Sequence, residues 1–243
     1  MVNYLITGAN SFLGKAITAR LSLNPENRLL LVSRKNISGE RSYGDTISYL
    51  PNTNLLNEDS LQQMRKECEL FFTGPVHVIN CVGYYKGQEQ FEETSPGEAK
   101  KIFESNFTTV YNTAFAIMPY LMANGGGHFI TFSCKSVRYR YPFMAPFSAS
   151  KAALECLMGS LANEFSKYGV IANAFSLSTL DTAYERTIKP YGDYQNWLKL
   201  DDIAKTLEEV ITGNFHLMNG NTIDLFQYSD SFFNKSYFDR IKK

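Results

Sequence analysis

The chain has 243 residues, enough to bury one sizeable hydrophobic core, and two full-sized domains are the less favoured division. Its 24 lysines and arginines balance its 24 aspartates and glutamates, so no overall basic field draws it to nucleic acid or to an acidic membrane. No window approaches the roughly 20 apolar residues of a membrane helix. We therefore expect a small-molecule substrate as the partner, with neither nucleic acid nor a membrane.

The amino terminus has no basic segment followed by a long apolar stretch, so the sequence predicts a first strand there and not a signal peptide. The four cysteines lie far apart and lack metal-ligand spacing. Two of them, Cys81 and Cys156, stand in apolar runs, where a thiol behaves as a small hydrophobic group. These features favour a cytoplasmic protein without a metal site.

Short apolar runs rich in β-branched residues alternate along the chain with longer segments of helical period. This alternation is typical of a parallel sheet with helices on both faces, a doubly wound α/β fold of three layers. The pattern predicts strands near 2–7, 28–33, 47–50, 75–81, 127–133, 170–175 and 221–226. It predicts helices near 12–23, 58–70, 98–123, 147–167 and 201–212.

No linker or repeat interrupts this pattern, so we expect a single domain over 1–243 with a mostly parallel, seven-stranded sheet. The longest irregular stretches lie near 84–97 and 177–199, each after a predicted strand and before the next helix. In such sheets, ligands bind at the edge formed by the carboxyl ends of the strands, where these stretches begin. We therefore interpret both stretches as substrate loops.

A turn containing glycine follows the first predicted strand and leads into a helical segment. A dinucleotide pyrophosphate needs a backbone that it can approach closely, exposed amides and the positive end of a helix dipole. Gly8 and Gly14 can supply the tight turn and the close contact between helix and strand, while Ser11 or Phe12, depending on the alignment, replaces the usual middle glycine. A turn without a ligand is the alternative, which the position between strand and helix disfavours. The expected dinucleotide-binding residues are Thr7, Gly8, Asn10, Ser11, Phe12, Leu13 and Gly14.

The second predicted strand ends in Ser33, Arg34 and Lys35. A fold that prefers NAD places a carboxylate roughly 20 residues beyond the turn, where it accepts hydrogen bonds from the ribose 2′-hydroxyl. Two cations and a hydroxyl suit a 2′-phosphate instead. The sequence therefore favours NADP(H) over NAD(H), with an exposed basic turn as the alternative interpretation.

These residues and four further stretches resemble the short-chain dehydrogenase/reductase family, in order from Tyr4 to about Leu225. The turn is similar to the family's T-G-x-x-G-x-x-G motif, with Ser11 in place of its middle glycine. The resemblance implies a Rossmann fold that binds a nicotinamide dinucleotide. It also implies further cofactor and active-site positions: Asn54 and Leu55 beside the adenine, Asn80, Val82 and Gly83 along the cofactor cleft, and Asn106 as the active-site asparagine.

The catalytic region departs from the family. The motif that commonly reads Y-S-A-S-K is Phe147-Ser148-Ala149-Ser150-Lys151 here, so the lysine is kept and the phenol is missing. The family's serine, 13 residues before its tyrosine, falls on Cys134, with Ser133 one residue off. Thr182 remains where a threonine often meets the nicotinamide amide or the pyrophosphate. The resemblance thus makes Asn106, Cys134, Phe147 and Lys151 the catalytic positions, although phenylalanine cannot transfer a proton.

Another group could replace the missing phenol: Tyr139, Tyr141, the thiol of Cys134, or a water held by Lys151. The segment 135–141 gathers three cations and two aromatic residues, which would suit a flat, anionic substrate, with a solvated basic loop as the alternative. A loose, local resemblance to the substrate loop of dihydropteridine reductases adds heteroaromatic substrates. It covers Thr179–Thr182, Arg186, Pro190, Asp193 and Trp197.

Two hypotheses of different class remain. The first is an NADP(H)-dependent oxidoreductase with an altered proton donor, acting on a small carbonyl, imine or heteroaromatic substrate. The second is a catalytically impaired protein that keeps NADP(H) as a ligand for sensing, assembly or a non-redox step. In either case the resemblance implies a homodimer or homotetramer formed through the two long predicted helices.

Overall fold

The computed structural model describes residues 1–35, 45–87, 89–192, 194–213, 215 and 217–226. Within them, seven strands form one sheet in the order β3-β2-β1-β4-β5-β6-β7, and all neighbouring strands are parallel. The predicted seven-stranded sheet is confirmed, and it is parallel throughout. The strands are β1 (Asn3–Thr7), β2 (Arg28–Val32), β3 (Ile47–Leu50), β4 (Val76–Asn80), β5 (Gly127–Cys134), β6 (Val170–Leu177) and β7 (Thr222–Leu225).

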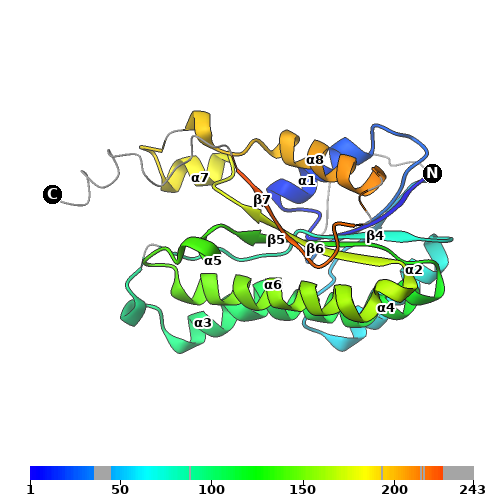
Figure 1. The fold of residues 1–243 in the computed structure, drawn as a ribbon, viewed down its shortest axis with the longest axis horizontal. Coiled ribbons are helices and arrows are strands. Elements are labelled where there is room, and N and C mark those ends of the chain that lie inside the picture. Colours follow the sequence, from blue (N-terminus) through cyan, green and yellow to red (C-terminus); the bar gives the residue numbers. More distant parts are fainter. Residues whose placement is uncertain (36–44, 88, 193, 214, 216, 227–243) are drawn as a thin grey trace.

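Helices cover both faces of the sheet, as Figure 1 shows. One face carries α2 (Glu58–Phe71), α4 (Thr109–Ala123) and α6 (Ala145–Phe165), and the opposite face carries α1 (Phe12–Leu21) and α8 (Leu200–Thr212). The three-layer, doubly wound fold is therefore confirmed. Among the described residues, no helix is both long and apolar enough to cross a membrane.

The strands are buried from both sides, which explains their continuous apolar runs. Along β1, Leu5 belongs to the core beneath α2, α4 and α6, whereas Tyr4 and Ile6 belong to the core beneath α1 and α8. All three side chains have no exposed surface. Such a strand has no polar face, so alternation of apolar and polar residues could not have revealed it.

The predicted helix near 98–123 is wrong as a single element. The chain forms α3 (Pro96–Phe103), a π-helical turn η2 (Glu104–Thr108) and then α4. The apolar period continues through all three pieces, so the sequence pattern did not reveal the wider turn. The predicted helix near 147–167 begins earlier, at Ala145, because Pro146 fits a first helical turn that needs no backbone N–H donor.

Two short helices were not predicted. α5 (Ser136–Tyr139) follows β5, and α7 (Ala183–Ile188) lies inside the stretch near 177–199. The short 3-10 turns η1 (Phe91–Glu93), η3 (Ser166–Tyr168) and η4 (Tyr194–Asn196) complete the described elements. Both stretches interpreted as substrate loops do follow parallel strands, β4 and β6.

The strand order reverses between β1 and β4. The chain leaves β1 toward β2 and β3 on one side, and returns to build β4 to β7 on the other. Crevices form outside the carboxyl ends of the strands at such a reversal. The residues that follow β1, β4, β5 and β6 therefore meet at one edge of the sheet.

Two histidines lie side by side on neighbouring strands, far from that edge. The backbone N–H of His128 on β5 donates to Nδ1 of His77 on β4 at 3.1 Å. Burial and the neighbouring His128 lower the pKa of His77 to about 3, and burial lowers the pKa of His128 to about 4. Both rings are therefore neutral in the folded protein at neutral pH.

This pair makes the fold sensitive to acid. Because an unfolded histidine titrates near pH 6.5, the unfolded chain binds more protons than the folded chain below that pH, and stability falls as the pH drops. When the pH falls from 7 to 5, each ring should lower the free energy of unfolding by up to about 2 kcal/mol. His77→Gln keeps an acceptor for the His128 amide but does not titrate. Urea denaturation at pH 7 and pH 5 should show that this variant loses less unfolding free energy than the native chain. An equal loss would contradict the conclusion that His77 is held neutral in the folded protein.

Candidate active site

The turn after β1 enters α1 through a side-chain cap. The hydroxyl of Ser11 accepts a hydrogen bond from the Gly14 amide at 3.0 Å. Ser11 has an extended backbone with a φ of −70°, so a glycine is not required there. Serine in place of the family's middle glycine therefore introduces no backbone strain, and its side chain caps the N-terminus of α1.

Gly8 and Gly14 make the close contacts that the sequence predicted. Gly8 has a φ of +67°, and an added Cβ would lie 2.7 Å from the Cys81 backbone. A Cβ on Gly14 would lie 2.4 Å from the Gly8 carbonyl oxygen. The turn is thus pressed between α1 and the end of β4, and both positions require glycine.

The turn fits a dinucleotide pyrophosphate. The first amides of α1, those of Phe12 and Leu13, precede the first intrahelical hydrogen bonds, and α1 directs its positive end the same way. Among the described residues, the buried hydroxyls of Thr7 and Ser178 lack a hydrogen-bond partner. Thr7 ends β1 and Ser178 follows β6, so both hydroxyls lie at the carboxyl edge of the sheet. Asn10 lies in the turn itself and is half-buried.

Ser33, Arg34 and Lys35 follow β2 directly. Ser33 is buried, and its hydroxyl donates to the Lys35 carbonyl at 2.5 Å. Arg34 and Lys35 are exposed. The hydrogen bond shapes the backbone into a tight turn, and it leaves both cationic side chains on the surface next to the glycine turn.

The two residues predicted beside the adenine differ in exposure. Asn54 is exposed, and its Oδ1 accepts from the Leu56 amide at 3.1 Å. Leu55 is buried, and its carbonyl accepts from the Asn112 side chain at 2.8 Å. Asn54 therefore shapes this turn through its own side chain, while Leu55 supplies the apolar surface.

The end of β4 is fixed by its own asparagine. Oδ1 of Asn80 accepts from the Val82 amide at 3.1 Å, and its Nδ2 donates to the Thr113 hydroxyl on α4 at 3.4 Å. Gly83 follows, and a Cβ there would lie 3.2 Å from Oδ1 of Asn106 and 3.6 Å from Nζ of Lys151. The structure thus brings the predicted residues Gly83, Asn106 and Lys151 together.

Asn106 lies in the π-helical turn η2 and is fully buried. Its Oδ1 accepts from the Tyr84 amide at 2.8 Å, and its Nδ2 donates to the Tyr84 carbonyl at 3.1 Å and to the Ser150 hydroxyl at 3.0 Å. Single π turns in α-helices frequently mark functional sites. Here the amide joins the loop after β4 to α6.

Lys151 is buried on α6, and its Nζ donates to the Phe132 carbonyl at 2.8 Å. Burial lowers the pKa of this ammonium group to about 8, although Cys134 and Glu155 act in the opposite direction. Near neutral pH the side chain of Lys151 is therefore mostly still charged, with a minor neutral fraction. The catalytic role that the resemblance implies for Lys151 stays a prediction.

Phe147 lies one turn before Lys151, with the ammonium nitrogen 5.8 Å from the centre of its ring. Its side chain is buried, and the ring of Tyr85 contacts it edge-on with centroids 5.1 Å apart. The ring occupies the place of the family's tyrosine without offering a hydroxyl.

Cys134 and Ser133 point to opposite sides of β5, as successive strand residues do. The Ser133 hydroxyl bonds to the Glu155 carboxylate on α6, so Ser133 does not take the place of the family's serine. Cys134 is half-buried, and its sulfur accepts from the Ser136 amide at 3.5 Å. The assignment of Cys134 to the family's serine position stays a prediction.

The segment after β6 closes over this edge. Thr182 is buried and caps α7, where its hydroxyl accepts from the Glu185 amide at 3.0 Å. Beyond α7, the buried Trp197 packs edge-on against Tyr194 with centroids 4.8 Å apart. Asp181 pairs with Arg186 at 2.6 Å. Asp193, named above in the loose resemblance, lies outside the described residues.

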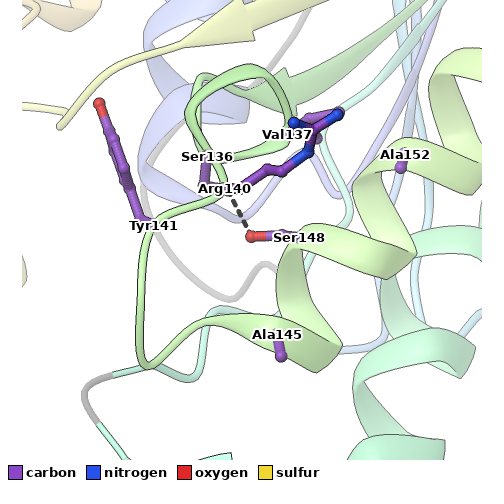
Figure 2. Close-up of a pocket in the computed structure, with 7 residues that line it drawn as sticks. All are labelled: Ser136, Val137, Arg140, Tyr141, Ala145, Ser148 and Ala152. Carbon is purple, nitrogen blue, oxygen red and sulfur yellow. Dashed lines mark hydrogen bonds between the residues drawn. The ribbon is translucent and has the colours of Figure 1, made fainter.

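The substrate-lining interpretation expected the cations of segment 135–141 to lie at the active site. The structure places two of them elsewhere. Arg138 pairs with Asp224 on β7, and Lys135 is buried with its ammonium 5.8 Å from the Phe226 ring. The segment instead borders a hollow of about 290 Å³ against α6, shown in Figure 2. Its lining is Ser136, Val137, Arg140, Tyr141, Ala145, Ser148 and Ala152.

Tyr139 and Tyr141 belong to this outer side. Their rings stack on each other with centroids 5.8 Å apart, and Tyr139 is exposed. Figure 2 shows Tyr141 directed away from Ser148, the residue that follows Phe147 on α6. The structure therefore argues against these two phenols as replacements for the missing one.

Sequence reasoning missed three residues of the site: Ser150, Tyr85 and Lys189. Ser150 was visible inside the Y-S-A-S-K-like motif, and its bond to Asn106 gives it a role. Tyr85 lies two residues after Gly83, a spacing that could have drawn attention to it. Lys189, whose ammonium lies 5.4 Å from the Tyr85 ring centre, carried no local signal.

The sequence model described as short chain dehydrogenase matches residues 3–191. The chain therefore belongs to the short-chain dehydrogenase/reductase family of oxidoreductases. An uncharacterised oxidoreductase of Staphylococcus aureus is 25% identical over 218 residues, which cover 88% of this chain and 92% of that protein.

Solved structures show the same fold at low identity. A 3-ketoacyl-(acyl-carrier-protein) reductase from Brucella melitensis complexed with NADH has a TM-score of 0.79 at 19% identity, covering 93% of this chain and 96% of that one. A tyrosine-to-phenylalanine variant of ElxO with NADPH bound also has a TM-score of 0.79 at 19% identity, covering 92% and 96%. Proteins of this fold thus bind either nicotinamide dinucleotide.

Proposed function

We propose that this chain is an NADP(H)-dependent reductase of a small carbonyl, imine or heteroaromatic compound, with a proton donor other than the family's tyrosine. The observation that carries the proposal is the buried ammonium of Lys151, held beside Gly83 and Asn106 at the carboxyl ends of the strands. A buried lysine is costly to keep unless it has a function or a full set of partners. The intact glycine turn supports the same conclusion.

The residues of the site divide into a binding part and a chemical part. The turn from Gly8 to Gly14 would hold the pyrophosphate, and Lys151 the nicotinamide ribose. The bound dinucleotide would supply a hydride. Cys134 would orient the substrate oxygen, and the walls formed by Phe147 and Trp197 would exclude water from it. Positioning of this kind is worth more in rate than one proton donor.

A second candidate function is binding without turnover. Phe147 and Cys134 favour it, since both depart from the catalytic residues of the family. The ElxO variant supports its physical basis, because a tyrosine-to-phenylalanine change in that protein is compatible with bound NADPH. In that case the chain would keep NADP(H) for sensing, assembly or a non-redox step.

Turnover separates the two candidates. The native chain should oxidise NADPH with at least one member of a panel of aldehydes, ketones, imines and pterins. Lys151→Met should reduce the rate about ten- to hundredfold, the effect of losing a charged hydrogen bond. Lys167→Met, an exposed lysine after α6, is the matched control and should leave the rate unchanged. NADPH binding without consumption across the panel would favour the second function.

The preference for NADP(H) rests on Arg34 and Lys35, whose exposed cationic side chains suit a 2′-phosphate. Calorimetry should show tighter binding of NADPH than of NADH. Arg34→Asp should weaken NADPH binding about ten- to hundredfold and strengthen NADH binding, because a carboxylate repels the phosphate and accepts from a free hydroxyl. Arg65→Asp, on the exposed side of α2, should change neither affinity. Equal binding of the two dinucleotides by the native chain would contradict the preference.

We also propose assembly into a homodimer or homotetramer through α4 and α6. Aromatic side chains repeat every four residues along the outer side of α3, η2 and α4, and Phe115 is 71% exposed. Apolar stripes of this kind mark protein interfaces. The stripe consists of Phe103, Phe107, Tyr111 and Phe115. The cytoplasmic location stays a prediction from the sequence.

Sedimentation tests this assembly. The native chain should sediment as a dimer or tetramer, and Phe115→Lys should shift it toward the monomer because a charge cannot be buried there without a partner. Leu70→Lys on α2 is the matched control, since Leu70 is also 71% exposed but lies outside the stripe. A native chain that sediments as a monomer, or a Phe115→Lys variant that keeps the native mass, would contradict the interface.

A further inference from the structure

The site described above lacks a hydroxyl where the substrate oxygen needs a proton. Phe147 fills that place, so a replacement donor has to lie within reach of the same ring. The ring of Tyr85 does, because it meets Phe147 edge-on with centroids 5.1 Å apart and an interplanar angle of 89°. Tyr85 is half-buried, so its phenol is neither fully solvated nor sealed in the core.

The backbone next to Tyr85 is fixed at the site. Tyr84 bonds through both its amide and its carbonyl to the buried Asn106 side chain. Gly83 before it lies against Lys151. Tyr85 thus lies near the start of the loop after β4, two residues beyond Gly83. Two hydrogen bonds fix the backbone of the preceding residue.

A lysine and the N-terminus of a helix lie near the phenol. The ammonium of Lys189 lies 5.4 Å from the centre of the Tyr85 ring, and its Nζ is 2.8 Å from a Glu185 carboxylate oxygen. The Tyr85 hydroxyl and the Met144 side chain both approach the Cβ position of Gly87, at 2.9 Å and 3.2 Å. Met144 is the N-cap of the 21-residue helix α6, whose dipole is positive at that end. The helix dipole would stabilise the phenolate that remains after a proton has left, and so would the Lys189 ammonium, whose charge Glu185 partly offsets.

Other described tyrosines near the site contact other groups or are exposed, among them Tyr184, which is 56% exposed. The Tyr84 hydroxyl bonds to Glu98 at 2.8 Å on the exposed side, and the Tyr194 hydroxyl bonds to the Pro190 carbonyl at 2.9 Å. Tyr191 is exposed. Tyr139 and Tyr141 stack on each other on the outer side of α6. Of these phenols, Tyr85 has the ring contact with Phe147.

We propose that Tyr85 is the proton donor of this site and that Lys189 is its electrostatic partner, so a tyrosine–lysine pair from two loops replaces the phenol that α6 lacks. The inference rests on the proposed function. Bound NADPH would supply the hydride that reaches the carbonyl carbon and would leave as NADP⁺, while the carbonyl π pair would move to oxygen. The Tyr85 O–H bond breaks, its proton bonds to that oxygen, and solvent protonates the phenolate again.

Removal of the hydroxyl alone tests the donor. Tyr85→Phe keeps the ring contact with Phe147, so a packing role would leave turnover unchanged. As a donor, Tyr85 should instead account for a fall in kcat of roughly a hundredfold or more. Tyr168→Phe removes a hydroxyl beyond the far end of α6 and should leave kcat unchanged. Adding Phe147→Tyr to Tyr85→Phe should restore kcat to within about tenfold of the native value, since a phenol returns near Lys151.

Lys189 is a positioning residue in this scheme. Lys189→Met should lower kcat in the native chain but have little further effect once Tyr85 is phenylalanine, because the two residues act as one unit. Lys189→Arg keeps the charge and should retain most of the rate. Additive losses from Lys189→Met and Tyr85→Phe would overturn the partnership.

A readout without turnover uses the chain labelled with [¹³Cζ]tyrosine. The resonance that Tyr85→Phe removes should shift when NADP⁺ is added, whereas the resonance that Tyr168→Phe removes should not. A shift together with the loss of kcat supports Tyr85. A Tyr85→Phe variant that turns over within twofold of the native chain, or an unshifted Tyr85 resonance, overturns this inference and leaves the proposed function standing. A native chain that binds NADPH without consuming it overturns both.

Discussion

The buried side-chain amide of Asn106 is the interaction on which the site depends. Two of its hydrogen bonds hold the loop after β4 at Tyr84, and the third reaches Ser150 on α6. The amide thus connects two segments that are distant along the chain. A buried amide is costly unless nearly all of its hydrogen-bonding capacity is used. The π-helical turn meets that requirement by directing the amide at both partners. Lys151, Gly83 and the start of the 84–97 loop take their positions from this junction.

The two substitutions in the catalytic motif leave that junction unchanged. Phe147 keeps the apolar contacts of an aromatic ring, and Cys134 keeps a small side chain at the end of β5. Neither change disturbs the glycine turn, the cap at Ser11 or the hydrogen bonds of Asn80. Under the proposed function, the changes fall on groups that exchange protons, while the groups that would position a ligand are kept.

The fold could be predicted from the sequence because strands buried on both faces leave continuous apolar runs, and the helices repeat apolar residues at 3.6-residue spacing. The π turn at Asn106 could not, since it adds to a helix without breaking the apolar period. The glycine turn and Lys151 were predicted from local motifs. The ring contact between Tyr85 and Phe147, and the ammonium of Lys189 beside them, join residues distant along the chain, and no local pattern encodes such contacts. The sequence likewise could not show which of Ser133 and Cys134 faces α6, because that depends on how β5 packs against the helix.

The central strand β1 has a consequence for how the chain is made. β1 pairs with β2, but its other edge pairs with β4, so Thr7 faces Asn80 only after the intervening segment has left the ribosome. Until then one row of backbone amides and carbonyls in this buried strand stays unpaired and available to other chains. Synthesis at roughly 5–20 residues per second keeps that edge open for several seconds. A chaperone that shields this strand during translation would protect the nascent chain when it is most prone to aggregate.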